Sequence, residues 1–208
     1  MDLERIWQLF QAGGVVMYPL IFCSILVVAV TLERHWSYKE AESFRGGKTD
    51  FLSSLQEGRW LEPPATAGAF SKLLQDAYSW RGLEASVQLQ MFENAAATIM
   101  GRFRERLSYL ETIVTLAPLL GLLGTVVGMI QSFQVLAVKT GQMQAITGGV
   151  GEALVATATG LCVAVLALLC HSWLCQRLER LAGDMEECGA ALLTGSNVAT
   201  GRRSRETA

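Results

Sequence analysis

The chain has 208 residues, 51% of them hydrophobic, and its mean hydropathy is positive. This apolar fraction is too high for an ordinary soluble domain of the same length and favours a small helical membrane protein. A formal net charge of −2 says little about partners, and we expect no nucleic acid among them.

The N-terminal part predicts a short amphipathic segment followed by a membrane span. Residues 1–13 place Leu3, Ile6, Trp7 and Phe10 on one helical face, as in a helix lying in a membrane interface. Residues 14–32 carry no charge over 19 positions, which is enough to cross a hydrocarbon core of about 30 Å. Asp2 and Glu4 do not fit the basic start of a signal peptide, so we predict no cleavage.

Residues 33–111 form the largest predicted segment between spans. Gly46-Gly47, Gly58 and Pro63-Pro64 break its first half into short pieces. From about Leu83 to Glu111 apolar residues recur at helical spacing. We expect this helix to continue directly into a second span at 112–138.

A short loop at 139–145 leads to a third predicted span at 146–174. A heptad-like stripe follows on a helix at 175–193, and it consists of Leu174, Leu178, Leu181, Met185, Cys188 and Leu192. The stripe fits packing within one subunit as well as packing between subunits. The polar tail at 194–208 has no periodicity and is predicted to be disordered.

The positions of basic residues predict the orientation of the chain. Near the spans they lie on the side of residues 33–111 and 175–193, at Arg34, Lys39, Arg102, Arg104, Arg106, Arg177 and Arg180. By the positive-inside rule the N-terminus is outside and the C-terminus inside. The predicted fold is therefore an all-α polytopic membrane protein with three transmembrane helices, the second and third extended into the cytoplasm.

Few polar or helix-breaking residues interrupt the second and third spans. Pro118 is expected to bend the second span, and Gly124 with Gly128 forms a small-xxx-small pair that allows close helix packing. Glu152 is the only acidic residue of the third span. A carboxylate there costs about 2.5 to 3.5 kcal/mol, so it must face protein or water, stay protonated, or extend to the outer surface.

Two threonines of the third span differ in their angular position relative to Glu152. At 100° per residue, Thr159 lies about 20° and Thr157 about 140° from Glu152 around the helix. One flat polar stripe therefore does not contain both threonines. Either hydroxyl can instead bond to a carbonyl of its own helix.

The spans also resemble a known family. The segments LAPLLGLLGTVVGMIQSF and GGVGEALVATATGLCVAV are similar to the second and third spans of the MotA/TolQ/ExbB proton-channel family, nearest to its ExbB and TolQ branch. The resemblance implies a bacterial inner-membrane homo-oligomer, a pentamer, enclosing the single-span helix of an ExbD- or TolR-like partner whose helix carries an aspartate. It also allows a TonB- or TolA-like protein as a further partner.

Position by position, the resemblance places the family's ion path on Thr125, Glu152 and Thr157. Further residues that we expect to line the pore or to pack helices are Thr159, Pro118, Gly124, Gly128, Gly149, Ala153 and Gly160. One departure is Leu166, which stands where family members often have a proline. That difference bears on a helix bend and leaves the polar motif intact.

Three kinds of function remain to be compared. The resemblance implies a proton-channel subunit of a motor complex that uses the proton motive force to drive an envelope process such as TonB-dependent transport. The alternative is a non-conducting membrane scaffold, for which a carboxyl at the depth of Glu152 has no use. An enzyme is not expected, because no catalytic arrangement occurs in the spans, and neither a cofactor nor a metal is implied.

Overall fold

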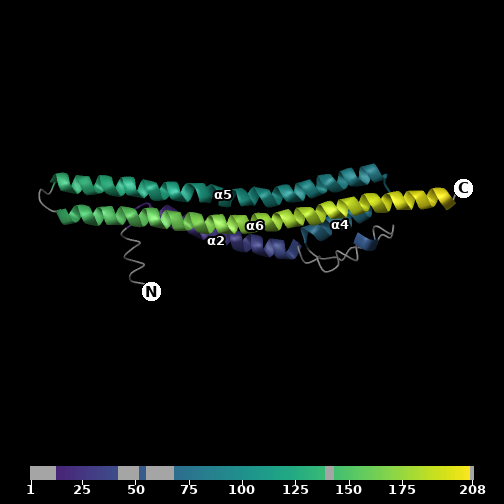
Figure 1. Cartoon of the computed structure of the whole chain (residues 1–208), viewed down its shortest axis with the longest axis horizontal. Helices are drawn as coiled ribbons and strands as arrows, with labels where there is room; N and C mark the ends of the chain where they lie inside the picture. Colours follow the sequence, from purple (N-terminus) through teal and green to yellow (C-terminus); the bar gives the residue numbers. More distant parts are fainter. Residues whose placement is uncertain (1–12, 42–51, 55–67, 139–142, 207–208) are drawn as a thin grey trace. The chain divides into compact units, whose positions relative to one another are not determined.

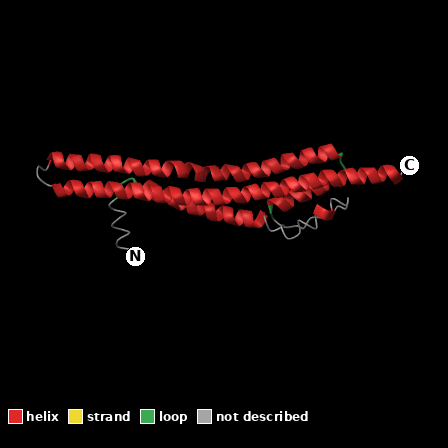
Figure 2. Cartoon of the chain, in the orientation of Figure 1, coloured by secondary structure: helices red, strands yellow, loops and turns green. Residues whose placement is uncertain are grey.

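The computed structural model of the chain describes residues 13–41, 52–54, 68–138 and 143–206, without the side chains of 40–41, 135–138, 143–147, 152 and 196–206. Its labelled elements are the helices α2 (Met17–Ala41), α4 (Ala69–Ser79), α5 (Ala85–Val138) and α6 (Met143–Glu206), shown in Figure 1. Figure 2 shows no strand among the described residues. The all-α prediction is confirmed.

Three of these helices are long and apolar enough to cross a membrane. The candidate spans are Met17–Lys39, Ala85–Gln134 and Gly148–Gly195. The second and third belong to helices of 54 and 64 residues, which are much longer than the roughly 20 residues that a bilayer requires. The three predicted transmembrane helices are therefore present, two of them with long extensions.

The helix ends differ in part from the expected ones. The predicted continuation of the helix from residue 83 into the second span is confirmed, since α5 is one helix that runs through Pro118. We expected a disordered tail at 194–208, whereas in the structure α6 continues to Glu206. Between residues 143 and 206 there is no proline and no glycine with positive φ to end it. Residues 1–12 and 139–142 lie outside the described part.

The chain divides into two compact units. The first combines Met1–Leu32 with Leu107–Trp173 and so contains most of the predicted spans. The second combines Glu33–Arg106 with Leu174–Ala208. Both units draw on α2, α5 and α6, because each of these helices continues from one unit into the other.

In the first unit, α5 and α6 touch along a seam of small residues. A Cβ added at Gly160 would lie 2.6 Å from the Ala117 carbonyl oxygen and 2.9 Å from the Gly121 Cα. One at Gly121 would lie 3.0 Å from the Cα of Thr157. The two backbones are thus in direct contact, which only residues without bulky side chains permit.

The remaining seam contacts follow the same pattern in an antiparallel register. Along α5 the seam residues are Ala117, Gly121, Gly124, Gly128 and Ser132, and along α6 they are Gly160, Ala156, Ala153 and Gly149. A Cβ added at Gly124 would lie 2.5 Å from the Ala156 Cβ, and one added at Gly128 would lie 2.9 Å from the Ala153 Cβ. Spacings of three and four residues keep these positions on one face of each helix.

Large apolar side chains of the first unit point away from this seam. Exposed examples are Phe22 and Ile25 on α2, Leu119, Leu122 and Phe133 on α5, and Leu154, Val165 and Leu169 on α6. In the most apolar window of each candidate span, only 28%, 22% and 33% of the residues are buried inside the chain. Small residues inside and large ones outside suit a unit whose surroundings are lipid or other apolar helices.

The second unit has a conventional apolar core. The stripe residues Leu174, Leu178, Leu181, Met185, Cys188 and Leu192 are all buried within the chain. Phe92 of α5 and Phe70, Leu73 and Leu74 of α4 are buried as well. Of the two packing modes left open by the heptad pattern, the stripe therefore uses the one within a single chain.

Replacing Gly160 by alanine should destabilise the protein by about 1 to 3 kcal/mol, because the new methyl group would collide with backbone atoms that cannot rotate away. Gly151→Ala on the same helix is the matched control, since a Cβ there meets no atom within 4 Å. It should be neutral or slightly stabilising, because alanine favours helix. Thermal unfolding of both full-length variants in detergent tests this, and equal losses at the two positions would contradict the seam.

Candidate functional site

The hydroxyl of Thr157 connects the third predicted span to the second. Its Oγ1 donates to the carbonyl oxygen of Gly121 at 2.9 Å, from α6 to α5. In an α-helix the carbonyl of residue 121 also accepts the N–H of residue 125, so Thr157 lies within a turn of Thr125. The structure therefore brings these two predicted ion-path residues to the same part of the seam.

The other hydroxyls of the seam region bond within their own helices. Thr125 donates to the Leu122 carbonyl at 2.7 Å, Thr159 to the Val155 carbonyl at 2.8 Å, and Ser132 to the Gly128 carbonyl at 2.8 Å. Of the two threonines for which back-bonding was considered, Thr159 shows it and Thr157 instead bonds across the seam, while Thr125 also bonds within its own helix. A hydroxyl that donates one bond keeps lone pairs that can accept from water or from a protonated carboxyl.

Glu152 belongs to α6, and its side chain lies outside the described residues. Along α6 it precedes Thr157 by five residues, about 7.5 Å of helix. The neighbouring glycines 148 and 151 have open space around them, because an added Cβ at either meets no atom within 4 Å. Gly148 is one turn before Glu152 on the same helical face, so the chain itself leaves room on that face.

Most of the predicted packing residues lie in the contact between α5 and α6. Gly124, Gly128, Gly149, Ala153 and Gly160 all face the opposite helix of the same chain, and Gly149 touches Ser132. Pro118 is part of α5 beside Ala117. The structure uses these small faces for the contact between two helices of one chain.

The sequence interpretation missed Gly121 and Ala156, although both are central to the seam. Gly121 accepts the Thr157 bond and approaches Gly160, and Ala156 faces Gly124. A signal was present, because positions 117, 121, 124 and 128 form one small-residue stripe. Reading this stripe as a whole, instead of one glycine pair, would have found Gly121, and the matching stripe at positions 149, 153, 156 and 160 would have found Ala156.

A second polar group lies in the second unit, where α2 and α5 leave their apolar stretches. Glu33 Oε1 accepts from Arg34 Nη2 at 3.0 Å and also from Arg106 Nη1. Arg34 lies 5.8 Å from the centroid of the Phe103 ring, and Phe103 stacks on Tyr38 with centroids 5.0 Å apart. Arg177 Nη1 is 3.1 Å from His35 Nδ1 in the same unit.

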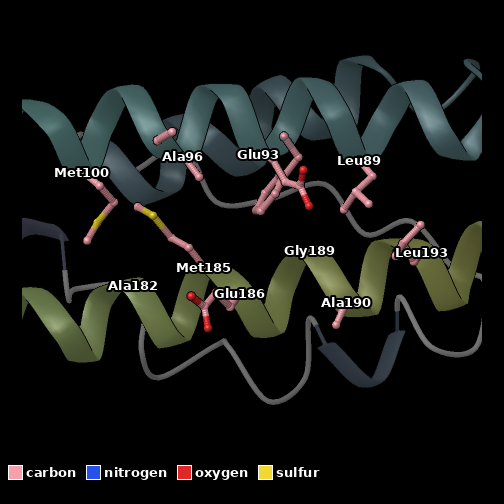
Figure 3. Close-up of a pocket in the computed structure, with 12 residues that line it drawn as sticks. Leu89, Glu93, Ala96, Met100, Ala182, Met185, Glu186, Gly189, Ala190 and Leu193 are labelled. Atoms are coloured by element: carbon pink, nitrogen blue, oxygen red, sulfur yellow. The ribbon is translucent and has the colours of Figure 1, made fainter.

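The second unit also contains a pocket of about 520 Å³ between α5 and α6. Figure 3 shows Met100 and Leu89 on one helix opposite Met185 and Leu193 on the other. Glu93 and Glu186 add two exposed carboxylates to this mainly apolar lining. Such a pocket can receive apolar side chains, and it holds no arrangement for catalysis.

Metal binding has no support in the described part of the chain. Among those residues no group of three histidine, cysteine, aspartate or glutamate side chains is placed to hold an ion. The five cysteines are free, and Cys23 and Cys188 are buried. At the seam between α5 and α6 the described polar groups are the hydroxyls of Thr157 and Ser132 and backbone carbonyls, and Glu152 adds a carboxyl to α6.

Comparison with known proteins agrees with this arrangement. Residues 66–187 match the model of the MotA/TolQ/ExbB proton channel family. The chain is 36% identical over 200 residues to the biopolymer transport protein ExbB of Neisseria gonorrhoeae, covering 85% of this chain and 90% of that protein. It is 35% identical over 174 residues to the biopolymer transport protein ExbB-like 1 of Synechocystis sp., covering 79% and 68% of the two chains.

A shorter match reaches the TolQ branch. The Tol-Pal system protein TolQ of Haemophilus influenzae is 35% identical over 80 residues, which cover 38% of this chain and 35% of that protein. The matched family model spans more than half of the chain, and its members are transport proteins, not enzymes. With three candidate membrane helices, a small-residue seam crossed by the Thr157 hydrogen bond and these relatives, the chain belongs to the MotA/TolQ/ExbB proton channel family.

Proposed function

We propose that this chain is the proton-channel subunit of an inner-membrane, energy-transducing complex of the ExbB or TolQ type. Glu152, Thr125 and Thr157 form its ion path, and the proton motive force supplies the energy for an envelope process such as TonB-dependent transport. One elementary charge crossing 100 mV releases about 2.3 kcal/mol, which is enough to bias a conformational step.

The observation that carries the proposal is the hydrogen bond from Thr157 to Gly121. It places the polar motif of α6 against α5 at a point where the surrounding surface is apolar. A hydroxyl held there in a fixed direction keeps an acceptor lone pair for water or for a partner's carboxyl. Thr125, held by the Leu122 carbonyl, offers a second one within about a turn.

Glu152 supplies the group that can exchange a proton. Support for its access comes from the open space around Gly148 and Gly151, which leaves room for water or for a partner helix beside that turn of α6. Because an unpaired charged carboxylate is costly in lipid, the group is stable there either protonated or beside water or a polar partner. A carboxyl with these two options is what proton transfer along a helix requires.

The partner in this proposal is an ExbD- or TolR-like protein with one membrane helix and an aspartate in it. The N-terminus lies outside and the C-terminus inside, as the clustering of Arg34, Arg106 and Arg177 on one side of the spans favours. The small residues of the seam already face each other across α5 and α6. In this proposal, subunits therefore contact the partner and each other through the faces that carry large apolar side chains.

Glu152→Gln should abolish partner-dependent proton flux and envelope function while leaving expression and oligomer size unchanged, because glutamine keeps size and hydrogen bonding but cannot titrate. Glu152→Asp should retain part of the activity. Flux into vesicles that contain the partner measures this directly. Glu179→Gln is the control, because it removes the same charge from an exposed position of α6 beyond the predicted span. This variant should conduct normally.

A scaffold that conducts no ions predicts a different outcome. In that case Glu152 only anchors α6 at the membrane surface, and glutamine serves about as well there. A fully active Glu152→Gln protein would therefore reject the channel proposal and favour the scaffold.

Thr157→Val should weaken proton flux and also lower stability by about 0.6 kcal/mol or more, because the Gly121 carbonyl loses the bond that crosses the seam. Thr157→Ser keeps the hydroxyl and should preserve both properties better. Flux and thermal unfolding are measured on the same preparations. Wild-type flux in the valine variant would remove Thr157 from the ion path.

Native mass spectrometry of the full chain in mild detergent should give a homo-oligomer, and the family resemblance favours a pentamer. Leu119 and Leu154 are exposed on the isolated chain, so their faces are open to a neighbouring subunit as well as to lipid, and close van der Waals packing is what would favour the subunit. A monomer under gentle conditions would contradict this part of the proposal.

A further inference from the structure

The arginine cluster of the second unit has more hydrogen-bond donors than acceptors. We define it as Glu33, Arg34, Tyr38 and Arg106. Both guanidinium groups donate to the same oxygen, Oε1 of Glu33. Arg34 Nε and the Tyr38 hydroxyl are buried and have no partner among the described residues.

The cluster also carries uncompensated positive charge. It contains two guanidinium groups and one carboxylate, and Arg34 is only 8% exposed. A buried guanidinium strongly favours a second anionic oxygen over water, because water accepts a bond without offsetting the charge. What the cluster lacks is therefore an anion with several acceptor oxygens.

The sequence places this cluster where phospholipid headgroups lie. Glu33 and Arg34 directly follow Leu32, the last residue of the uncharged first span, and Arg106 precedes the second span by a few residues. The side chains of Arg106 and Glu33 are 52% and 50% exposed, so an external group can reach them. The Arg34 side chain is only 9% exposed and donates to Glu33.

We propose that this cluster binds the phosphate of a membrane phospholipid headgroup, with Arg106 as the exposed contact and Arg34 as the supporting charge. A planar guanidinium can donate two parallel bonds to phosphate oxygens, which suits Arg106 better than a lysine would. The site does not depend on proton conduction, since none of its residues belongs to the proposed ion path.

The test uses the full chain in mild detergent after removal of co-purified lipid. Native mass spectrometry then counts bound phosphatidylglycerol during a titration, and diacylglycerol with the same acyl chains serves as the lipid without phosphate. Arg106→Gln should bind phosphatidylglycerol about tenfold more weakly. Arg104→Gln is the matched control, because it removes the same charge about 160° away around α5 and should bind as wild type.

A second test compares Arg34→Lys, which keeps the buried supporting charge, with Arg34→Gln, which removes it, and the glutamine variant should bind phosphatidylglycerol more weakly than the lysine variant. Equal binding by wild type and Arg106→Gln would overturn the proposal, as would equal binding of diacylglycerol and phosphatidylglycerol. In a further arm, inorganic phosphate at the same concentration should not displace the lipid. Displacement would show that the site takes a free anion, and would reject the lipid assignment.

Discussion

The direct backbone contact between α5 and α6 is the constraint on which the first unit depends. Lipid is as apolar as leucine, so two membrane helices gain little from hiding large side chains against each other. They gain from close van der Waals contact, and this is possible only if the facing residues are small. Gly121 and Gly160 meet that requirement, and the outward position of residues such as Leu119 follows from it.

The same constraint explains which predictions from sequence succeeded. Three long apolar stretches can form only helices in a bilayer, because every backbone N–H and C=O must be bonded inside the segment. The helical class and the three candidate spans followed from this alone. The family resemblance assigns Thr125 and Thr157 to an ion path, which stays a prediction, and the structure places both within about a turn of the Gly121 carbonyl.

Other features could not be derived, because they depend on which faces meet. Gly124 and Ala153 offer the same small surface to a neighbouring subunit as to a helix of the same chain, and sequence does not distinguish the two. The direction of the Thr157 hydroxyl is equally hidden, since bonding to its own helix was available at Thr159 and is used there. The stripe from Leu174 to Leu192 shows an apolar face without showing its partner.

The seam also restricts where movement can occur in the proposed motor. At Gly160 the nearest atoms beyond its own helix are backbone atoms of Ala117 and Gly121, which cannot change rotamer to let α6 slide. The Thr157 bond to Gly121 opposes rotation of one helix against the other at the same level. Since α5 and α6 are therefore fixed to each other in the first unit, conformational change in such a motor belongs to surfaces made of flexible side chains. Those are the exposed faces carrying Leu122 and Leu154, where a partner helix or a second subunit can shift by exchanging rotamers without breaking a backbone contact.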